Sequence, residues 1–316
     1  MSELFDLVII GGGPAGLTAG IYGARAGLST LILEKLSPGG QVVTTDILEN
    51  YPGFVEPIGG FELVDKMVEQ ATKFGVEIRM AEVTSIESPP DKEHKVLHLA
   101  GEEDISAIGV IVATGAYHKH LGVPGEDRFW GRGVSCCATC DGMFYKGKRV
   151  VVVGGGDTAI KESLFLTKFA SEITIIHRRD RLRATKILQD KILSMTDKVK
   201  FEWKSAVKEI IGENHVTGVK LGYVDSDKEK ILECDGVFIF VGFTPSTDFL
   251  KGFIEMDERG YVLTDDNMKT SVPGVFACGD ARKKLLRQII TACGEGATAA
   301  FAAEQYIENI KGSAYE

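Results

Sequence analysis

The expected fold of this chain follows from residues 5–16, which read FDLVIIGGGPAG. An apolar run of strand length ends there in G-x-G-x-x-G, and an alanine-rich segment of helical character follows and closes near Gly27. A second apolar run, at residues 28–33, ends at Glu34, which lies 23 residues after Gly11 and can accept hydrogen bonds from both ribose hydroxyls. A strand, a glycine-rich turn, a helix and a second strand ending in an acid form a dinucleotide-binding unit.

The residue types in this first fingerprint (residues 11–16) suit a pyrophosphate. Gly11 makes the tight turn, Gly13 lets the backbone approach the ligand, and Gly16 lets the helix pack closely on the strand. Pro14 and Ala15 complete the motif at the start of the helix, whose N–H groups and partial positive charge favour an anion.

The motif occurs a second time at residues 149–159, which read RVVVVGGGDTA. Its candidate nucleotide ligands are Gly154, Gly156, Asp157 and Thr158. Ala159 stands in place of the third glycine, which the packing role tolerates. The next predicted strand, at residues 173–176, ends at His177, again 23 residues after the first glycine of the motif.

The residues at this second strand end are basic rather than acidic: His177, Arg178 and Arg179. A carboxylate there repels a ribose 2′-phosphate, whereas arginines bind one through charge-assisted hydrogen bonds. Residues 177–191 carry six Lys or Arg against two Asp in a chain of net charge −9, although such a run can also be a solvated helix face. We predict an NADP(H) site with Arg178, Arg179 and Arg183 on the phosphate. His177 either stacks on or hydrogen-bonds the adenosine, or is an ordinary strand-end histidine.

Cys137-Ala-Thr-Cys140 lies between the two fingerprints. Two thiols three residues apart can close into a readily opened disulfide, or form half of a zinc site, or remain unpaired. A tetrahedral zinc site needs two more ligands, and Cys234, Cys278 and Cys293 form no second CxxC. Redox use is therefore favoured, with electrons passing from one cofactor through another to sulfur.

Composition excludes several other classes of protein. Of the 316 residues, 44% are hydrophobic and 26% charged, as is ordinary for a globular protein with room for two domains. The acidic balance argues against a nucleic-acid binder or a basic membrane-surface protein. The longest apolar runs are shorter than a membrane span, and no secretory signal is visible, so a cytoplasmic location is expected.

The order of the motifs predicts one domain inserted into another. The first half ends in a buried-type strand at residues 109–115, and the second half ends similarly at residues 237–242. The tail has no fingerprint of its own, but carries a strand at 274–277 and a small-residue helix from about 296 to 310. We predict an α/β fold of two three-layer, Rossmann-like domains: residues 1–116 with 246–316, interrupted by residues 117–245. The two crossings, near residues 117 and 245, form a plausible hinge.

Over essentially its whole length the chain resembles the low-molecular-weight, bacterial-type thioredoxin reductases. The resemblance rests on the order and spacing of short motifs: residues 11–16, 39–41 (GGQ), 49–53 (ENYPG), 113–115 (ATG), 137–142 (CATCDG), 154–159, 177–180 (HRRD), 279–280 (GD) and 287–288 (RQ). It implies FAD in the discontinuous domain, NADPH in the inserted domain, thioredoxin as the protein substrate and a homodimer.

The resemblance also assigns roles to individual residues. Beyond the first fingerprint, it places at the flavin site Glu34, Gly40, Gln41, Asn50, Ala113, Thr114, Gly115, Gly279, Asp280, Arg287, Gln288 and Ile289. It implies that Cys140 is the flavin-proximal sulfur and that Cys137 attacks thioredoxin. Asp141 would then be the acid or base that manages the thiol protons.

Two positions depart from the family pattern. Cys136 replaces the small residue usual before the first redox cysteine, and we interpret it as a spectator because a vicinal disulfide would strain the backbone. Met143 stands where the family commonly has an aromatic residue before Phe144, in a segment implicated in docking thioredoxin. The alternative among enzymes is a reductase of the same build that serves a peroxiredoxin-linked or glutaredoxin-like dithiol protein. A flavin-bound redox sensor without turnover is the alternative of another class, and the intact nicotinamide site argues against it.

Overall fold

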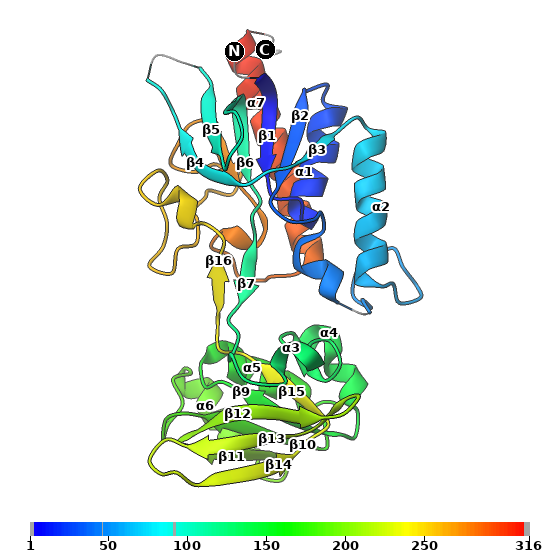
Figure 1. Ribbon diagram of the computed structural model, residues 1–316, viewed down its shortest axis with the longest axis vertical. Helices are drawn as coiled ribbons and strands as arrows, with labels where there is room; N and C mark the ends of the chain where they lie inside the picture. Colours follow the sequence, from blue (N-terminus) through cyan, green and yellow to red (C-terminus); the bar gives the residue numbers. More distant parts are fainter. Residues whose placement is uncertain (1–2, 46, 91–92, 313–316) are drawn as a thin grey trace. The chain divides into compact units, whose positions relative to one another are not determined.

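A computed structural model describes residues 3–45, 47–90 and 93–312 of the chain. The chain divides into two compact units: Met1–Tyr117 with Thr244–Glu316, and His118–Phe243. The second unit is thus inserted into the first, and its limits lie within two residues of the crossings expected from the sequence. Each unit is built on its own sheets (Figure 1), and each has its own hydrophobic core.

The first unit is built on a seven-stranded sheet of order β3-β2-β1-β6-β5-β4, in which β17 also pairs with β6. Its strands are β1 (Glu3–Ile10), β2 (Thr30–Glu34), β3 (Glu77–Met80), β4 (Val83–Glu87), β5 (Lys95–Leu99), β6 (Ile105–Val112) and β17 (Val275–Ala277). Strands β1, β2, β3, β6 and β17 pair in parallel, whereas β4 and β5 are antiparallel. The parallel strands bring the first fingerprint and residues 113–115 to the same edge of the sheet, because β1 and β6 end in register.

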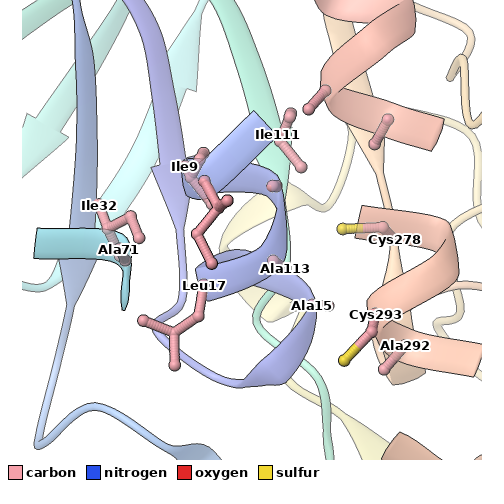
Figure 2. Close-up of a cluster of buried hydrophobic side chains, with 14 of the residues drawn as sticks. Ile9, Ala15, Leu17, Ile32, Ala71, Ile111, Ala113, Cys278, Ala292 and Cys293 are labelled. Carbon is pink, nitrogen blue, oxygen red and sulfur yellow. The ribbon is translucent and has the colours of Figure 1, made fainter. Parts of the chain in front are cut away.

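Successive side chains of β1 point to opposite faces of the sheet and belong to two different hydrophobic cores. Leu7 and Ile9 pack against three helices, α1 (Pro14–Arg25), α2 (Gly60–Lys73) and α7 (Ile289–Lys311). Figure 2 shows this cluster, in which Ala15 of α1 lies near Cys293 of α7. Val8 and Ile10 pack on the opposite face, with residues of β4, β5 and the segment 250–281. Residues that alternate along a strand point to opposite faces, so this apolar strand is covered on both sides.

Helix α7 begins earlier than the sequence suggested. We predicted its start near Gly296, but it begins at Ile289, so the prediction was wrong by seven residues. Gln288 caps the helix through a reciprocal pair of hydrogen bonds with Thr291, which satisfies N–H groups of the first turn. Such a cap depends on two polar side chains three residues apart. It produces no hydrophobic periodicity in the sequence, so the start of the helix was not detected.

The inserted unit contains a five-stranded parallel sheet of order β11-β10-β9-β15-β8 and a separate antiparallel sheet of order β12-β13-β14. Its strands are β8 (Val134–Ser135), β9 (Arg149–Val153), β10 (Glu172–His177), β11 (Val199–Trp203), β12 (Ser205–Gly212), β13 (Val216–Tyr223), β14 (Glu229–Glu233) and β15 (Gly236–Ile239). Its helices are α3 (Glu126–Phe129), α4 (Ala138–Asp141), η2 (Gly142–Tyr145), α5 (Asp157–Leu166) and α6 (Lys186–Leu193).

Strand β9 divides this unit into layers as β1 does the first. Val150 and Val152 pack against α5 and α6, whereas Val151 and Val153 pack against β12 and β13. Helices, parallel sheet and antiparallel sheet therefore form three layers (Figure 1). The predicted α/β fold of two Rossmann-like domains, one inserted into the other, is confirmed.

The two crossings between the units pair with each other. Strand β7 (Ala116–His118) and strand β16 (Phe243–Pro245) form a two-stranded sheet. Within the described residues, no helix combines the length and apolar character that a membrane crossing requires.

Candidate active site

The first fingerprint forms a closely packed turn. A Cβ added to Gly11, whose φ is +106°, would lie 2.5 Å from the carbonyl oxygen of Ala113. A Cβ on Gly16 would lie 1.8 Å from the carbonyl oxygen of Gly11. Gly13, in contrast, faces open space, with no heavy atom within 4 Å of an added Cβ. Two glycines thus close the turn, and the third leaves its backbone accessible to a ligand.

Glu34, the predicted ribose ligand, lies beside this turn. Its Oε2 accepts a hydrogen bond from Gly12 N–H (2.7 Å), and its Oε1 accepts one from Leu36 N–H (3.0 Å). These bonds hold the carboxylate at the end of β2. Each carboxylate oxygen has a second lone pair, so both oxygens can still accept bonds from a ligand.

Three further predicted flavin residues join segments that are distant in sequence. Gly40 packs on the first fingerprint, because its added Cβ would lie 3.5 Å from Gly13 Cα. Gln41 Nε2 donates to the carbonyl of Ala116 (2.6 Å). Asn50 Nδ2 donates to Gln288 Oε1 (3.0 Å), across 238 residues of sequence.

The start of α7 carries the remaining candidates on this side. Ile289 is its first residue, Gln288 is its cap, and the Arg287 guanidinium lies over the Tyr261 ring, 4.3 Å from the centroid. Gly279 packs directly on the first fingerprint, since its added Cβ would be 2.9 Å from that of Ala15.

A buried charge network surrounds Asp280 and was not predicted. Lys284, whose side chain is 4% exposed, pairs with Asp280 Oδ1 (3.4 Å) and Glu295 Oε1 (3.2 Å). Glu295 also pairs with Arg282 (3.0 Å) and accepts a hydrogen bond from Gly279 N–H (2.9 Å). Burial raises the pKa of Asp280, and the charge of Lys284 opposes that rise. The four-residue spacing of Asp280 and Lys284 was visible in the sequence and is compatible with an ion pair. That spacing did not indicate that the lysine would be buried.

The second fingerprint repeats the geometry of the first. Gly154 has φ +151°, and its added Cβ would lie 2.6 Å from the carbonyl oxygen of Phe240. Among the described residues, the nearest atom to a Cβ added at Gly156 is Arg183 Nη2, at 4.0 Å, so the predicted phosphate ligand lies at this turn. Two bonds fold the loop back over the turn: Arg183 N–H donates to the carbonyl of Gly155 (2.7 Å), and Thr185 N–H donates to Asp157 Oδ1 (2.6 Å).

His177 is buried, while the predicted phosphate ligands Arg178, Arg179 and Arg183 are exposed. The imidazole fills the space beside Gly155, whose added Cβ would lie 2.4 Å from a ring carbon. Burial lowers the pKa of His177, and the positive charges of the three arginines lower it further. The arginines therefore concentrate positive charge at the end of β10. Thr158 is also exposed at the start of α5.

Cys137 and Cys140 form a disulfide at helix α4, as the CxxC spacing predicted. Cys140 N–H donates to Cys137 Sγ (3.2 Å), so the sulfur caps the helix that carries its partner. Asp141 ends the helix, and its N–H donates to the carbonyl of Cys137 (3.1 Å).

The neighbouring Cys136 has a different environment. Its Sγ lies 2.9 Å from Nε2 of His118. Burial, together with the charge of Asp141, raises the pKa of the Cys136 thiol to about 12. Burial and the nearby His120 lower the pKa of His118 to about 4. Both groups are therefore neutral near pH 7, which agrees with the interpretation of Cys136 as a spectator.

Residues 5–296 match the family model described as pyridine nucleotide-disulphide oxidoreductase. The chain belongs to this family. A thioredoxin reductase of Listeria monocytogenes is 47% identical over 315 residues, covering 98% of this chain and 96% of that protein. One of Bacillus subtilis is 48% identical over 314 residues, covering 98% of each chain. The crystal structure of thioredoxin reductase from Streptococcus pyogenes superposes with a TM-score of 0.92 at 45% identity, covering 98% of this chain and 100% of that one.

Membership of the pyridine nucleotide-disulphide oxidoreductases implies a flavin and a pyridine nucleotide, and the residues present fit both. In the first unit, Gly13 is accessible, and Thr114 Oγ1 is buried without a hydrogen-bond partner among the described residues. Such an orphaned hydroxyl between Ala113 and Gly115 suits a polar ligand. In the second unit, the turn at Gly156 is accessible, and the exposed Arg183 lies 4.0 Å from a Cβ added there.

Proposed function

We propose that this protein is an NADPH-dependent thioredoxin-disulfide reductase, which passes electrons from NADPH through FAD and the Cys137–Cys140 disulfide to oxidised thioredoxin. The observation that carries the proposal is a CxxC disulfide in the same unit as a basic nucleotide site, joined to a second nucleotide-binding unit. The names of the most similar relatives support it.

NADPH is assigned to the inserted unit. The backbone of Gly154 and Gly156 would receive the pyrophosphate at the N-terminus of α5. The 2′-phosphate, which NADH lacks, would lie against Arg178, Arg179 and Arg183. Because these side chains are exposed, they can reorient onto the phosphate without breaking a buried structure.

FAD is assigned to the discontinuous unit, where it would supply the two-electron chemistry that links a nicotinamide to a disulfide. The first fingerprint and Glu34 would bind its adenosine diphosphate part. Thr114, Asp280 and the start of α7 would bind the remainder. Burial raises the pKa of Asp280 and the charge of Lys284 opposes that rise, so the pair favours a carboxylate that can accept hydrogen bonds from hydroxyl groups.

The dithiol form of Cys137 and Cys140 would reduce thioredoxin by two exchange steps. The Cys137 thiolate attacks one sulfur of the thioredoxin disulfide, forming a mixed disulfide and releasing a thioredoxin thiolate. Cys140, after losing its proton, attacks Cys137 sulfur, which restores the enzyme disulfide and releases the second thiolate. Asp141 is placed at the end of the same helix to pass the protons that the two thioredoxin thiolates take up.

We further propose that the inserted unit rotates during turnover. The cysteines must contact the flavin to be reduced, yet must be open to a protein partner to react with it. The nicotinamide needs the same flavin face. One rigid arrangement cannot satisfy all three contacts, and a hinge at the paired crossings β7 and β16 can alternate them. An engineered disulfide that joins the two units away from the cysteines should block turnover until it is reduced, and full activity of the locked protein would refute the rotation.

The direct test is to mix flavin-loaded protein with NADPH and oxidised thioredoxin and to follow NADPH oxidation and thioredoxin thiols together. Matched consumption of one NADPH per disulfide supports the proposal. Turnover with a glutaredoxin-like or peroxiredoxin-linked dithiol protein, but not with thioredoxin, would change the substrate. No turnover with any of them would indicate a sensor. A homodimer and a cytoplasmic location are expected along with this function.

A further inference from the structure

Glu162 of α5 contacts the redox helix. It is partly buried, and its Oε2 accepts a hydrogen bond from Ala138 N–H (3.2 Å). Ala138 is the first residue of α4 and shares a peptide bond with Cys137. The side chain therefore reaches from the helix that follows the second fingerprint to the start of the helix that carries the disulfide.

A cysteine at the start of a helix usually has a lowered pKa, and the position of the Glu162 carboxyl opposes this effect on Cys137. The unpaired N–H groups in the first turn of a helix stabilise a neighbouring thiolate and lower its pKa. In α4, Cys140 N–H points at Cys137 Sγ, but Ala138 N–H points at Glu162. Burial raises the pKa of Glu162, while hydrogen bonds from the backbone of Ala138 and Thr139 lower it. The N–H groups of Ala138 and Thr139 thus donate to the Glu162 carboxyl, which leaves fewer first-turn donors for Cys137.

The two helices are fixed against each other around this contact. Ala138 is fully buried in one cluster with Ile160 and Leu166 of α5. The Ser163 hydroxyl, next to Glu162, donates to the carbonyl of Ala159 within α5 and does not compete for the carboxylate. The carboxylate is consequently held in place by packing as well as by its hydrogen bond.

We infer that Glu162 is a positioning residue for the proposed reductase: it anchors the redox helix on α5 and opposes formation of the Cys137 thiolate in the reduced enzyme. The inference rests on the proposed function for the role of Cys137 as the outgoing nucleophile. Among the other titratable groups, Asp141 lies on the same helix as Cys137, and Cys136, the residue before Cys137, lies against His118. The charge of Asp141 raises the pKa of the adjacent Cys136 thiol, so its effect on Cys137 has the same sign as that of Glu162.

The test measures the ionisation of Cys137 directly in the flavin-loaded protein. A background of Cys136→Ala with Cys140→Ser leaves Cys137 as the one accessible cysteine thiol, because the remaining cysteines, Cys234, Cys278 and Cys293, are buried. The protein is reduced chemically and desalted, and the rate of alkylation by iodoacetamide is followed against pH by intact mass. Glu162→Gln keeps the shape and an acceptor oxygen but removes the charge.

We expect Glu162→Gln to lower the apparent pKa of Cys137 by about one unit, which raises alkylation below that pKa about tenfold. The matched control is Glu172→Gln. Glu172 is the first residue of β10, and its carboxylate pairs with Lys200. This variant should leave the pH profile of alkylation unchanged. Glu162→Asp keeps the charge and should stay near the unaltered profile.

An alkylation profile in Glu162→Gln that coincides with that of the unaltered background would overturn the inference, as would equal acceleration in Glu162→Asp. The measurement needs neither NADPH nor thioredoxin. Failure of thioredoxin turnover would therefore refute the proposed function without deciding the role of Glu162.

Discussion

The clearest test of the nucleotide assignment is to replace Arg178 and Arg179 by glutamine. Both side chains are exposed and follow β10, and together with Arg183 they lower the pKa of the buried His177. The positive potential of these arginines disfavours a proton on His177, and the same potential favours a phosphate dianion beside them. NADPH carries that phosphate and NADH does not, so the double variant should separate the two nucleotides.

The expected magnitude follows from the exposure of the two arginines. Hydrogen bonds to charged groups contribute about 1.5–3 kcal/mol each, and solvent screening places exposed pairs at the lower end of that range. Losing two such bonds costs about 3 kcal/mol, which corresponds to roughly a 100-fold loss of NADPH affinity. The affinity for NADH should change by about threefold or less, because the pyrophosphate contacts at Gly154 and Gly156 remain.

The assay measures the second-order rate constant for flavin reduction by NADPH and by NADH in single-turnover stopped flow, which needs no protein substrate. Arg132→Gln, which removes an exposed arginine elsewhere in the same unit, serves as the control. An equal loss with both nucleotides would show that the arginines support the fold or the pyrophosphate. Unchanged kinetics with NADPH would show that Arg178 and Arg179 do not bind the 2′-phosphate.

Three further outcomes are expected. Cys137→Ser or Cys140→Ser should abolish thioredoxin reduction while stopped-flow flavin bleaching by NADPH keeps its rate, because both sulfurs lie downstream of the flavin, and retained turnover in either variant would contradict the relay. Cys136→Ala should keep kcat within about twofold, since a thiol whose pKa is raised to about 12 is not a nucleophile near pH 7, and a loss of tenfold or more would give Cys136 a role. Because the pKa of His118 is lowered from 6.5 to about 4 on folding, the unfolded chain binds the proton first, and stability is lost as pH falls from about 6.5 to about 4. Urea titrations at pH 7 and pH 4 give the drop in the free energy of unfolding between these pH values. This drop should be about 3 kcal/mol smaller in His118→Phe than in the unaltered protein. In the control His215→Asn, which changes an exposed histidine, the drop should equal that of the unaltered protein.

The two glycine-rich turns and the disulfide could be predicted from the sequence, because each depends on the geometry of residues close together in the chain. Gly11 and Gly154 each follow an apolar strand and precede a helix, and in both units the structure places a positive φ and a close carbonyl at that glycine. The disulfide follows from the same kind of argument, since two residues between cysteines fix how closely their sulfurs can approach. These features depend on residues within about two dozen positions of one another, where the chain has few alternatives.

The tertiary structure decided which polar groups are buried and with what they pair. The Lys284 ammonium is almost completely buried between two carboxylates, although its place in a run of basic and apolar residues suggests a surface side chain. Asn50 meets Gln288 across 238 residues, and Glu162 reaches the backbone of the redox helix from a separate element. Burial and pairing of this kind depend on how whole elements pack, and no local pattern encodes them. The sequence by itself determined the two nucleotide-binding units and the disulfide, whereas packing alone determined the charges that surround them, because the free energy of a charge depends on neighbours brought together only by folding.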